Sequence, residues 1–247
     1  MQTVKETKIS ENTQSGNPEK QVSFDKYIET YKKEIQGSIN FIGQDVDFFI
    51  ELKANLLIDI SRKYLGGTKE IKTLDIGSGV GLVDRFLLKE MKSLYGVDVE
   101  EGVVEKAKEN NPTVNYRKYD GKTLPFENGT FDMAFAINVI HHVSPDDWEN
   151  FTGEMFRILK PGGIAAVFEH NPLNPLTQLA VSRCEFDIDA TLLHHSRIKK
   201  LFNHAGFEIL DDAYIVFFPF KSKFFRAAEK LIKWLPLGAQ HFAVGRK

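Results

Sequence analysis

The sequence predicts an α/β protein in which helices cover both faces of a largely parallel β-sheet. After Gly67, short apolar segments typical of strands alternate with amphipathic segments typical of helices, and this order builds parallel sheets. A glycine-rich turn follows the first of these strands, and Pro161-Gly162-Gly163 turns the chain into a later one. With 247 residues, the chain is long enough to bury a sizeable core as one domain with appendages.

Individual elements are predicted from apolar periodicity and turn residues. The expected strands span residues 71–76, 93–99, 114–119, 131–138, 164–169, 207–218 and 241–246. The expected helices span residues 82–91, 100–110, 145–159 and 223–235. A long helix should also begin after Asp45, a good N-terminal cap, and end at Gly66-Gly67, because its apolar residues recur at three- and four-residue spacing.

Charge and cysteine content exclude some classes of protein. A formal net charge of -2 and a pI of about 6.4 argue against a broad basic surface for nucleic acid. Cys184 is the only cysteine, so no intramolecular disulfide can form and a reducing compartment is expected. The N-terminal residues lack the apolar core of a signal peptide, and the apolar run 213–220 is much shorter than the roughly 20 residues of a membrane span. We therefore expect a cytoplasmic protein with no integral membrane span.

The most informative segment is LDIGSGVG, residues 74–81, which lies where the first strand ends. Open α/β sheets bind ligands at this edge, and glycines let the backbone approach a ligand closely. The spacing is G-x-G-x-G rather than the G-x-G-x-x-G of dinucleotide sites. Asp75 would repel a pyrophosphate but favours a cationic group.

Two further acidic residues follow at the ends of later strands. Asp98 closes the second strand, about 20 residues beyond the loop, where a carboxylate can accept hydrogen bonds from the hydroxyls of an adenosine ribose. Asp120, followed by Gly121, ends the third strand, where it can receive an adenine amine. Three acidic positions along one sheet edge predict a pocket for an adenosine cofactor with a cationic end, with a nicotinamide dinucleotide as the alternative.

These motifs resemble those of class I S-adenosylmethionine-dependent methyltransferases. Further matching segments are LPF at 124–126, FD at 131–132 and LKPGG at 159–163. The run 124–163, with His141-His142 inside it, is similar to the small-molecule branch (type 11) that includes the ubiquinone/menaquinone methyltransferases. The resemblance is close over 70–170 and looser beyond. It implies a Rossmann-like, doubly wound sheet of seven strands, mostly parallel, whose last strand inserts antiparallel.

The resemblance also implies positions that bind S-adenosylmethionine: Asp75, Gly77, Ser78, Gly79, Gly81, Asp98, Val99, Asp120, Gly121 and Asn138. The glycine loop would surround the methionine moiety, and Gly81 would let the next helix pack closely. Asp98 would hold the ribose, Val99 would flank the adenine, and Asp120 would bind its amino group. Asn138, at the end of the fourth strand, would face the reacting methyl.

Methyl transfer is an in-line displacement, so the protein mainly aligns the reactants and excludes water. An acceptor oxygen can also need a general base, for which histidine is the natural candidate. His170, which ends the fifth strand before a proline-stiffened loop, is the first candidate for a base or acceptor-positioning group. His141 is the second; it and His142 should not share one site, because neighbours on a helix diverge by about 100°. Glu169-His170 alone is a weak metal pattern, so no metal is expected.

Three parts of the chain are expected: a disordered tail at 1–22, a helical lid at 23–67, and the methyltransferase domain at 68–247, within which 171–235 forms the substrate-side loop and helices. In the lid, Tyr27 and Tyr31 are the candidates to close over the site. The expected partner is a small-molecule acceptor. Two alternatives remain at this stage: an NAD-dependent oxidoreductase, and a non-catalytic cofactor-binding or assembly protein that keeps the fold.

Overall fold

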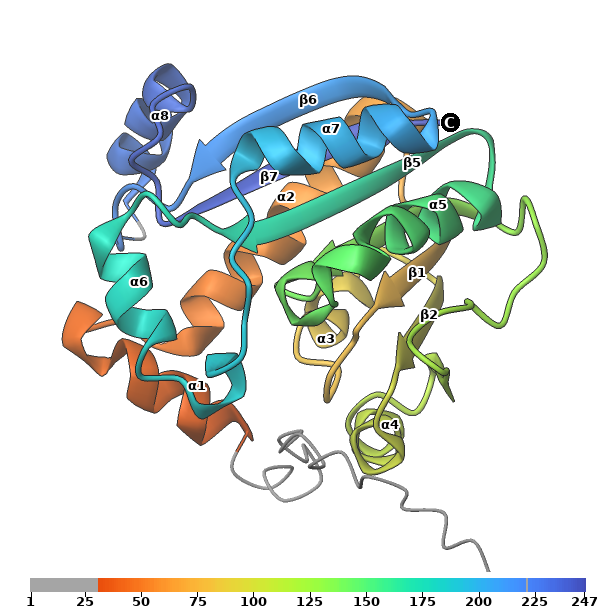
Figure 1. Ribbon diagram of the computed structural model, residues 1–247, viewed down its shortest axis with the longest axis horizontal. Helices are drawn as coiled ribbons and strands as arrows, with labels where there is room; N and C mark the ends of the chain where they lie inside the picture. Colours follow the sequence, from red (N-terminus) through yellow and green to blue (C-terminus); the bar gives the residue numbers. More distant parts are fainter. Residues whose placement is uncertain (1–30, 221) are drawn as a thin grey trace, which may run out of the picture.

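A seven-stranded sheet forms the centre of the computed structural model, which describes residues 31–220 and 222–247. The strands are β1 (Lys72–Ile76), β2 (Ser93–Asp98), β3 (Asn115–Lys118), β4 (Phe131–Ile137), β5 (Leu159–His170), β6 (Glu208–Ile215) and β7 (Gln240–Arg246), shown in Figure 1. Their order is β3-β2-β1-β4-β5-β7-β6. β7 is antiparallel to both neighbours and the other pairs are parallel, which confirms the predicted topology.

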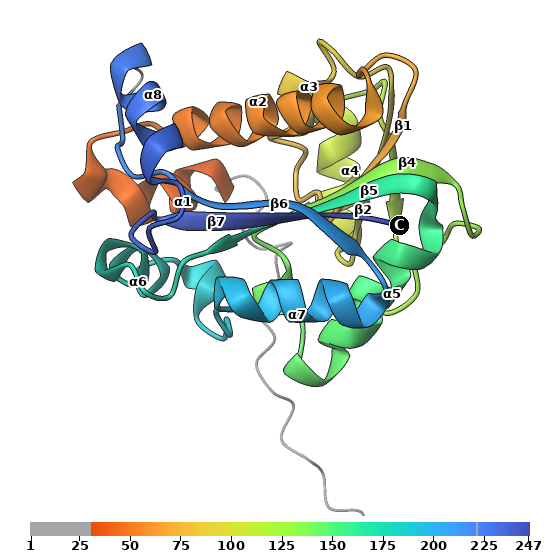
Figure 2. The ribbon, with the colours of Figure 1, turned by 90° about the horizontal axis from the view of Figure 1, so that it is seen from above.

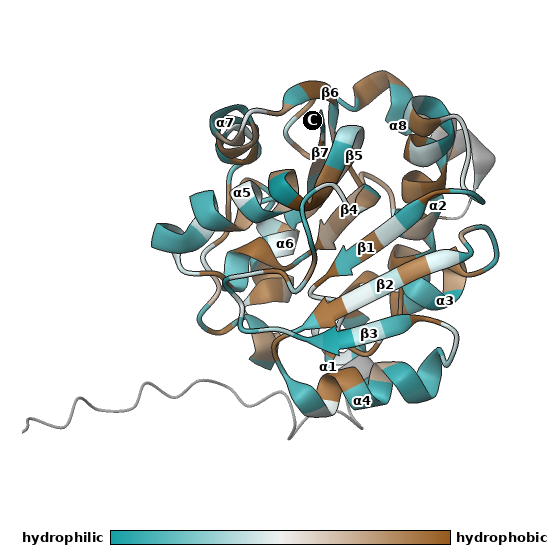
Figure 3. Ribbon diagram, turned by 90° about the vertical axis from the view of Figure 1, so that its right-hand side faces the viewer, coloured by the Kyte–Doolittle hydropathy of each residue, from teal (hydrophilic) through white to brown (hydrophobic). Residues whose placement is uncertain are grey.

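Helices cover both faces of this sheet (Figure 2). α2 (Val46–Leu65) and α4 (Glu101–Asn110) lie on one face, and α5 (Trp148–Ile158) and α7 (His195–Ala205) lie on the other. The remaining helices are α1 (Tyr31–Ile39), α3 (Asp84–Leu87), α6 (Pro175–Val181) and α8 (Lys223–Ile232). Figure 3 shows both polar and apolar residues on the flanking helices, as expected for elements with one buried side.

Two apolar clusters fill the space between the sheet and its helices. Residues alternate between them along β5: Phe168 packs in the cluster that contains Leu57 of α2, whereas Val167 packs in the cluster that contains Phe202 of α7. This alternation follows from the two-residue period of a strand. A central parallel strand buried on both faces is apolar at nearly every position, and this explains the uninterrupted apolar run before Glu169.

α2 forms where the sequence predicts it. The Asp45 side chain caps it by accepting a hydrogen bond from the Asp47 backbone N–H at 2.8 Å, and Gly66 ends it in the left-handed conformation with φ 76°. α1 packs against both α2 and α6. These three helices lie together beside the end of β5, on one side of the molecule in Figure 1.

Several elements are shorter than predicted, and two of them have a local cause in the backbone. α3 covers only Asp84–Leu87 rather than 82–91, because the hydrogen bonds around it mix three- and four-residue spacing instead of continuing an α-helix. The strand predicted at 207–218 ends at Ile215, because Val216 adopts φ 61°, which is incompatible with an extended strand.

Part of the predicted lid cannot be compared with the structure. The tail at 1–22 and Tyr27 lie outside the described residues, and Tyr31 begins α1 but its side chain is not among those described. Within 31–220 and 222–247, no helix combines the length and apolar character needed to cross a membrane.

Candidate active site

The glycine loop after β1 adopts conformations that require glycine. Gly77, Gly79 and Gly81 have φ values of 73°, 54° and 75°, which side chains disfavour. A Cβ on Gly77 would lie 2.5 Å from a methyl carbon of Val139, and one on Gly81 would overlap the amide of Asn111. The loop therefore packs tightly against its neighbours.

Two buried carboxyl groups, those of Asp75 and Asp84, lie close to this loop. Tyr116 donates its hydroxyl to Asp84 Oδ2 at 2.5 Å and accepts a hydrogen bond from Asn111 at 3.1 Å. Burial raises the pKa of Asp84 to about 6. Burial, together with the charges of Asp84 and Asp98, raises the pKa of Asp75 well above its usual range. A cation placed beside Asp75 would reverse this shift, because opposite charge favours the ionised form.

Asp98 ties the glycine loop to β2. Its Oδ2 accepts a hydrogen bond from the Gly79 N–H at 2.9 Å, and its Oδ1 accepts one from the Glu100 N–H at 3.2 Å. Burial raises the pKa of Asp98, although these hydrogen bonds act to lower it. The next residue, Val99, is 41% exposed and lies against Gly121, where an added Cβ would approach its methyl carbon to 3.3 Å.

Asp120 is exposed, and its carboxylate closes its own turn. Its Oδ1 accepts hydrogen bonds from the N–H groups of Lys122 at 2.8 Å and Thr123 at 2.7 Å. The hydrogen bonds from Thr123 and Lys122 lower the pKa of Asp120. This arrangement holds Gly121 in place, and the carboxylate is ionised and directed at backbone N–H groups.

A cavity of about 290 Å³ opens beside the glycine loop. It brings together five of the predicted site residues: Asp75, Gly77, Ser78, Asn138 and His170. Other predicted positions, namely Gly79, Gly81, Asp98, Val99, Asp120, Gly121 and His141, are not among its lining residues. Most of the wall is apolar, with side chains from α1, α2 and α6 such as Ile35, Ile39, Phe49, Ile50, Leu176 and Val181.

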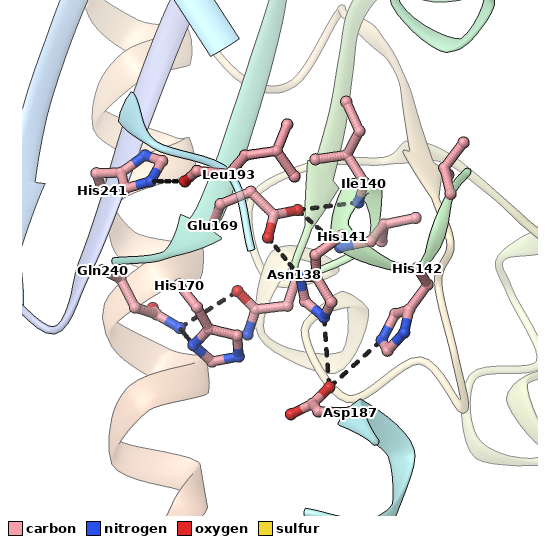
Figure 4. Close-up of polar contacts among 12 residues, drawn as sticks. Asn138, Ile140, His141, His142, Glu169, His170, Asp187, Leu193, Gln240 and His241 are labelled. Atoms are coloured by element: carbon pink, nitrogen blue, oxygen red, sulfur yellow. Dashed lines mark hydrogen bonds and ion pairs between the residues drawn. The ribbon is translucent and has the colours of Figure 1, made fainter. Parts of the chain in front are cut away.

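Asn138 follows β4 in a strained conformation. It has φ 56°, which is uncommon for a residue with a side chain and is concentrated at functional sites. Gln240 of β7 donates a hydrogen bond from Nε2 to Asn138 Oδ1 at 3.3 Å, and the same nitrogen lies 3.5 Å from His170 Nδ1. Gln240 therefore links the end of β4 to the end of β5, as Figure 4 shows.

His141 lies between two carboxylates (Figure 4). Its Nδ1 is 2.5 Å from Glu169 Oε2, and its Nε2 is 3.3 Å from Asp187 Oδ1. Burial alone would lower the pKa of His141, but Glu169 and Asp187 outweigh it and raise the pKa to about 10. The imidazolium thus stabilises the buried Glu169 and the partly buried Asp187.

His142 also faces Asp187, with its Nε2 3.5 Å from Asp187 Oδ1. The expectation that the adjacent histidines could not share one site was therefore wrong: their ring centroids lie 4.1 Å apart, and both side chains reach Asp187. Within the described residues, the side chains of His141, His142 and Asp187 are close enough to bind one metal ion. Their candidate ligand atoms all lie within 4.8 Å of one another.

Sequence reasoning did not single out Lys53, Asp187 or Gln240, all of which line the cavity. Lys53 lies on α2 and is only 6% exposed. Burial lowers the pKa of Lys53 to about 8, against the attraction of Glu169. Its sequence signal is a charge inside an apolar stripe: Lys53 follows Phe49 by four residues and precedes Leu57 by four.

Comparison with known proteins identifies the domain that contains the glycine loop. Residues 74–167 match the family described as "Methyltransferase domain". An uncharacterized methyltransferase of Synechocystis sp. is 29% identical over 143 residues, which is 56% of this chain and 68% of that protein. The ubiquinone biosynthesis O-methyltransferase of Mesorhizobium japonicum is 24% identical over 180 residues, which is 68% of this chain and 72% of that protein.

The fold also matches a solved structure. A possible histamine N-methyltransferase from Thermotoga maritima superposes with a TM-score of 0.65 at 22% identity, over 91% of this chain and 98% of that one. The chain is therefore an enzyme of the methyltransferase class that uses S-adenosylmethionine. The match over residues 74–167 and these relatives support a class I S-adenosylmethionine-dependent methyltransferase. The sequence interpretation as a methyltransferase is confirmed over the nicotinamide alternative.

Proposed function

We propose that this enzyme transfers a methyl group to a small, largely apolar acceptor that binds in the cavity beside the glycine loop. One observation carries the proposal. The same cavity is lined by Asp75 and Ser78 at the end of β1 and by Asn138 and His170 at the ends of β4 and β5. A methyl donor held at the first group and an acceptor held near the second would meet within one water-poor enclosure.

The proposed donor site follows the predicted residues. The methionine moiety lies along Asp75, Gly77, Ser78 and Gly79, with its cationic groups beside Asp75. The ribose exchanges hydrogen bonds with Asp98. When the donor binds, the Asp98 carboxylate accepts hydrogen bonds from the ribose hydroxyls. It does so in addition to, or in place of, the hydrogen bond that it accepts from the Gly79 N–H at 2.9 Å.

The adenine lies in the more open part of the proposed donor site. Val99, which is exposed against Gly121, flanks the ring. Asp120 accepts a hydrogen bond from the adenine amino group, since its carboxylate has lone pairs beyond those used by the two backbone N–H donors. The closed turn at Lys122 and Thr123 keeps that carboxylate in place.

His170 is the proposed group that contacts the acceptor. Burial lowers the pKa of His170 to about 4, so the imidazole is neutral near neutral pH and can accept a hydrogen bond or a proton. His141 does not line the cavity. We assign it instead to positioning, because its ring bridges Glu169 and Asp187 and thereby fixes the wall on which His142 and Asp187 face the cavity.

The cavity wall indicates which helices would cover the acceptor. Helices α1 and α2, from the segment 23–67, cover the cavity together with α6, from the segment 171–235. We propose that Tyr27 and Tyr31 complete this cover when the donor binds. An apolar acceptor suits the wall, and one relative is named for ubiquinone biosynthesis.

The proposal is tested by methyl transfer from isotopically labelled S-adenosylmethionine to extracted pools of small molecules. The enzyme is expected to label at least one organic-soluble product, and Asp98→Ala is expected to lose that labelling. If the wild-type enzyme binds the donor but labels protein or nucleic acid instead of small molecules, the acceptor class is wrong. If it binds the donor and labels nothing in any fraction, the chain is a non-catalytic binding protein.

A further inference from the structure

Lys53 is a buried ammonium group at the cavity, and it has no partner among the residues that the structure describes. It is 6% exposed and lines the cavity. Among residues 31–220 and 222–247, no hydrogen bond or ion pair to its ammonium is found. Burying a charge without a partner is costly, and buried charges are normally paired. A folded protein that keeps such a group has a use for it or a ligand that completes it.

The nearest carboxylate does not neutralise Lys53. Glu169 attracts it, but the ion pair that Glu169 makes among the described residues is with His141. Oε2 pairs with His141 at 2.5 Å, and Oε1 accepts the N–H groups of Val139 and Ile140 at 3.1 and 2.9 Å. The ammonium therefore receives only a longer-range attraction, which is too weak to offset burial.

The same cavity holds a second unsatisfied polar atom. Gln240 is 7% exposed, and its Oε1 has no hydrogen-bond partner among the described residues, although its Nε2 contacts Asn138 and lies near His170. Buried polar atoms are nearly always hydrogen-bonded. Among the described residues, an unpaired ammonium in an apolar cavity specifies what a ligand must supply, namely an anionic group, whereas Gln240 Oε1 is buried within the wall and a ligand reaches it only if the side chain moves.

The location of Lys53 favours the acceptor over the donor. The groups electrostatically coupled to Lys53 are Glu169 and His170, both at the end of β5. The groups coupled to Asp75 are Asp84 and Asp98, on the glycine-loop side. Lys53 thus belongs to the side of the cavity where His170 would meet the second substrate.

We propose that the methyl acceptor is an apolar molecule bearing a carboxylate or a comparable oxyanion, and that this anion pairs with Lys53. The inference rests on the proposed function, because it places the acceptor in the same cavity. The charges support it: the sulfonium donor brings a positive charge into an enclosure that already holds Lys53, and an anionic acceptor offsets it.

The test uses the full chain saturated with S-adenosylhomocysteine at pH 7. Calorimetry compares matched pairs of probes that differ only in charge: benzoate and benzamide, cinnamate and cinnamamide, octanoate and octanamide. At least one acid is expected to bind ten-fold more tightly than its amide. Lys53→Met, which keeps a similar shape without the charge, is expected to bring that ratio close to one. Lys63→Met, on the exposed side of the same helix, is expected to leave the ratio unchanged.

The oxyanion on Lys53 could instead be the carboxylate of the cofactor, and a second arm separates the two. S-Adenosylhomocysteine carries that carboxylate and 5′-methylthioadenosine lacks it. Lys53→Met is expected to change the affinities for both by the same small factor. If Lys53→Met loses affinity for S-adenosylhomocysteine alone, Lys53 binds the cofactor and the proposal is overturned. The proposal is also overturned if no wild-type pair shows a preference for the acid, or if Lys53→Met keeps that preference. Failure of the wild type to bind S-adenosylhomocysteine would instead count against the proposed function itself.

Discussion

Replacing Lys53 by Met should make the free protein more stable. Burial lowers the pKa of Lys53 from 10.5 to about 8, which corresponds to roughly 3 kcal/mol of destabilisation by the protonated group. The sign follows from proton linkage. Below about pH 8 the folded state carries the full penalty, and between about 8 and 10.5 the folded lysine is neutral while the unfolded one stays charged, so the penalty shrinks as pH rises.

Thermal unfolding of both proteins at pH 6.5 and pH 9.5 measures this effect. A gain of roughly 3 kcal/mol corresponds to an increase in Tm of about 6–12 °C for a chain of this size, and it should be clearly smaller at pH 9.5. Lys63→Met serves as the control, because Lys63 is 60% exposed and pairs with Asp211 outside the cavity. If Lys53→Met were less stable than wild type at pH 6.5, Lys53 would have a stabilising partner and the reasoning would be refuted.

The remaining predictions concern the loop, the donor site and the proposed base. Gly81→Ala should lower the free energy of unfolding in urea by about 2 kcal/mol or more, because φ is 75° and an added Cβ meets Asn111; an unchanged midpoint would contradict the packing. Binding of S-adenosylhomocysteine should release protons in the pH range where Asp75 titrates, because the ligand's ammonium lowers the raised pKa of Asp75, and Asp75→Asn should abolish the buffer dependence of the calorimetric heat. His170→Gln should reduce kcat/KM about 100-fold at unchanged cofactor affinity. In the wild type, loss of activity through protonation of His170 is expected only below about pH 5, because the pKa of His170 is about 4; equal turnover of the variant and the wild type would remove His170 as the base.

The sheet was predictable because its signals are local. Each strand is short, apolar and bounded by turn residues, and α2 has both a capping Asp45 and a terminal Gly66. α3 was overestimated because apolar periodicity continues past Leu87 while the backbone does not. The sequence analysis predicted neither α6 nor α7. α6 is a short helix that begins at Pro175, whereas α7 carries an apolar stripe at Ile198, Leu201 and Phe202 that the interpretation of the sequence overlooked.

The site was predictable only where a motif marks it. The glycine loop carries its own conformational signature, so its residues could be named from sequence. Gln240 meets Asn138 across 102 residues of sequence, and Asp187 meets His141 across 46; no local pattern encodes such pairs. Lys53 is visible in the sequence as a charge on an apolar helix face, but only the folded structure shows that it lines the cavity.

The central claim is that the glycine loop and Asp98 form one binding site for the methyl donor. Calorimetric titration of the wild type and Asp98→Ala with S-adenosylhomocysteine tests it most directly. We predict saturable binding by the wild type and an affinity at least ten-fold weaker for the variant, about 1.4 kcal/mol. Binding that is absent from the wild type, or equal in the two proteins, would contradict the account.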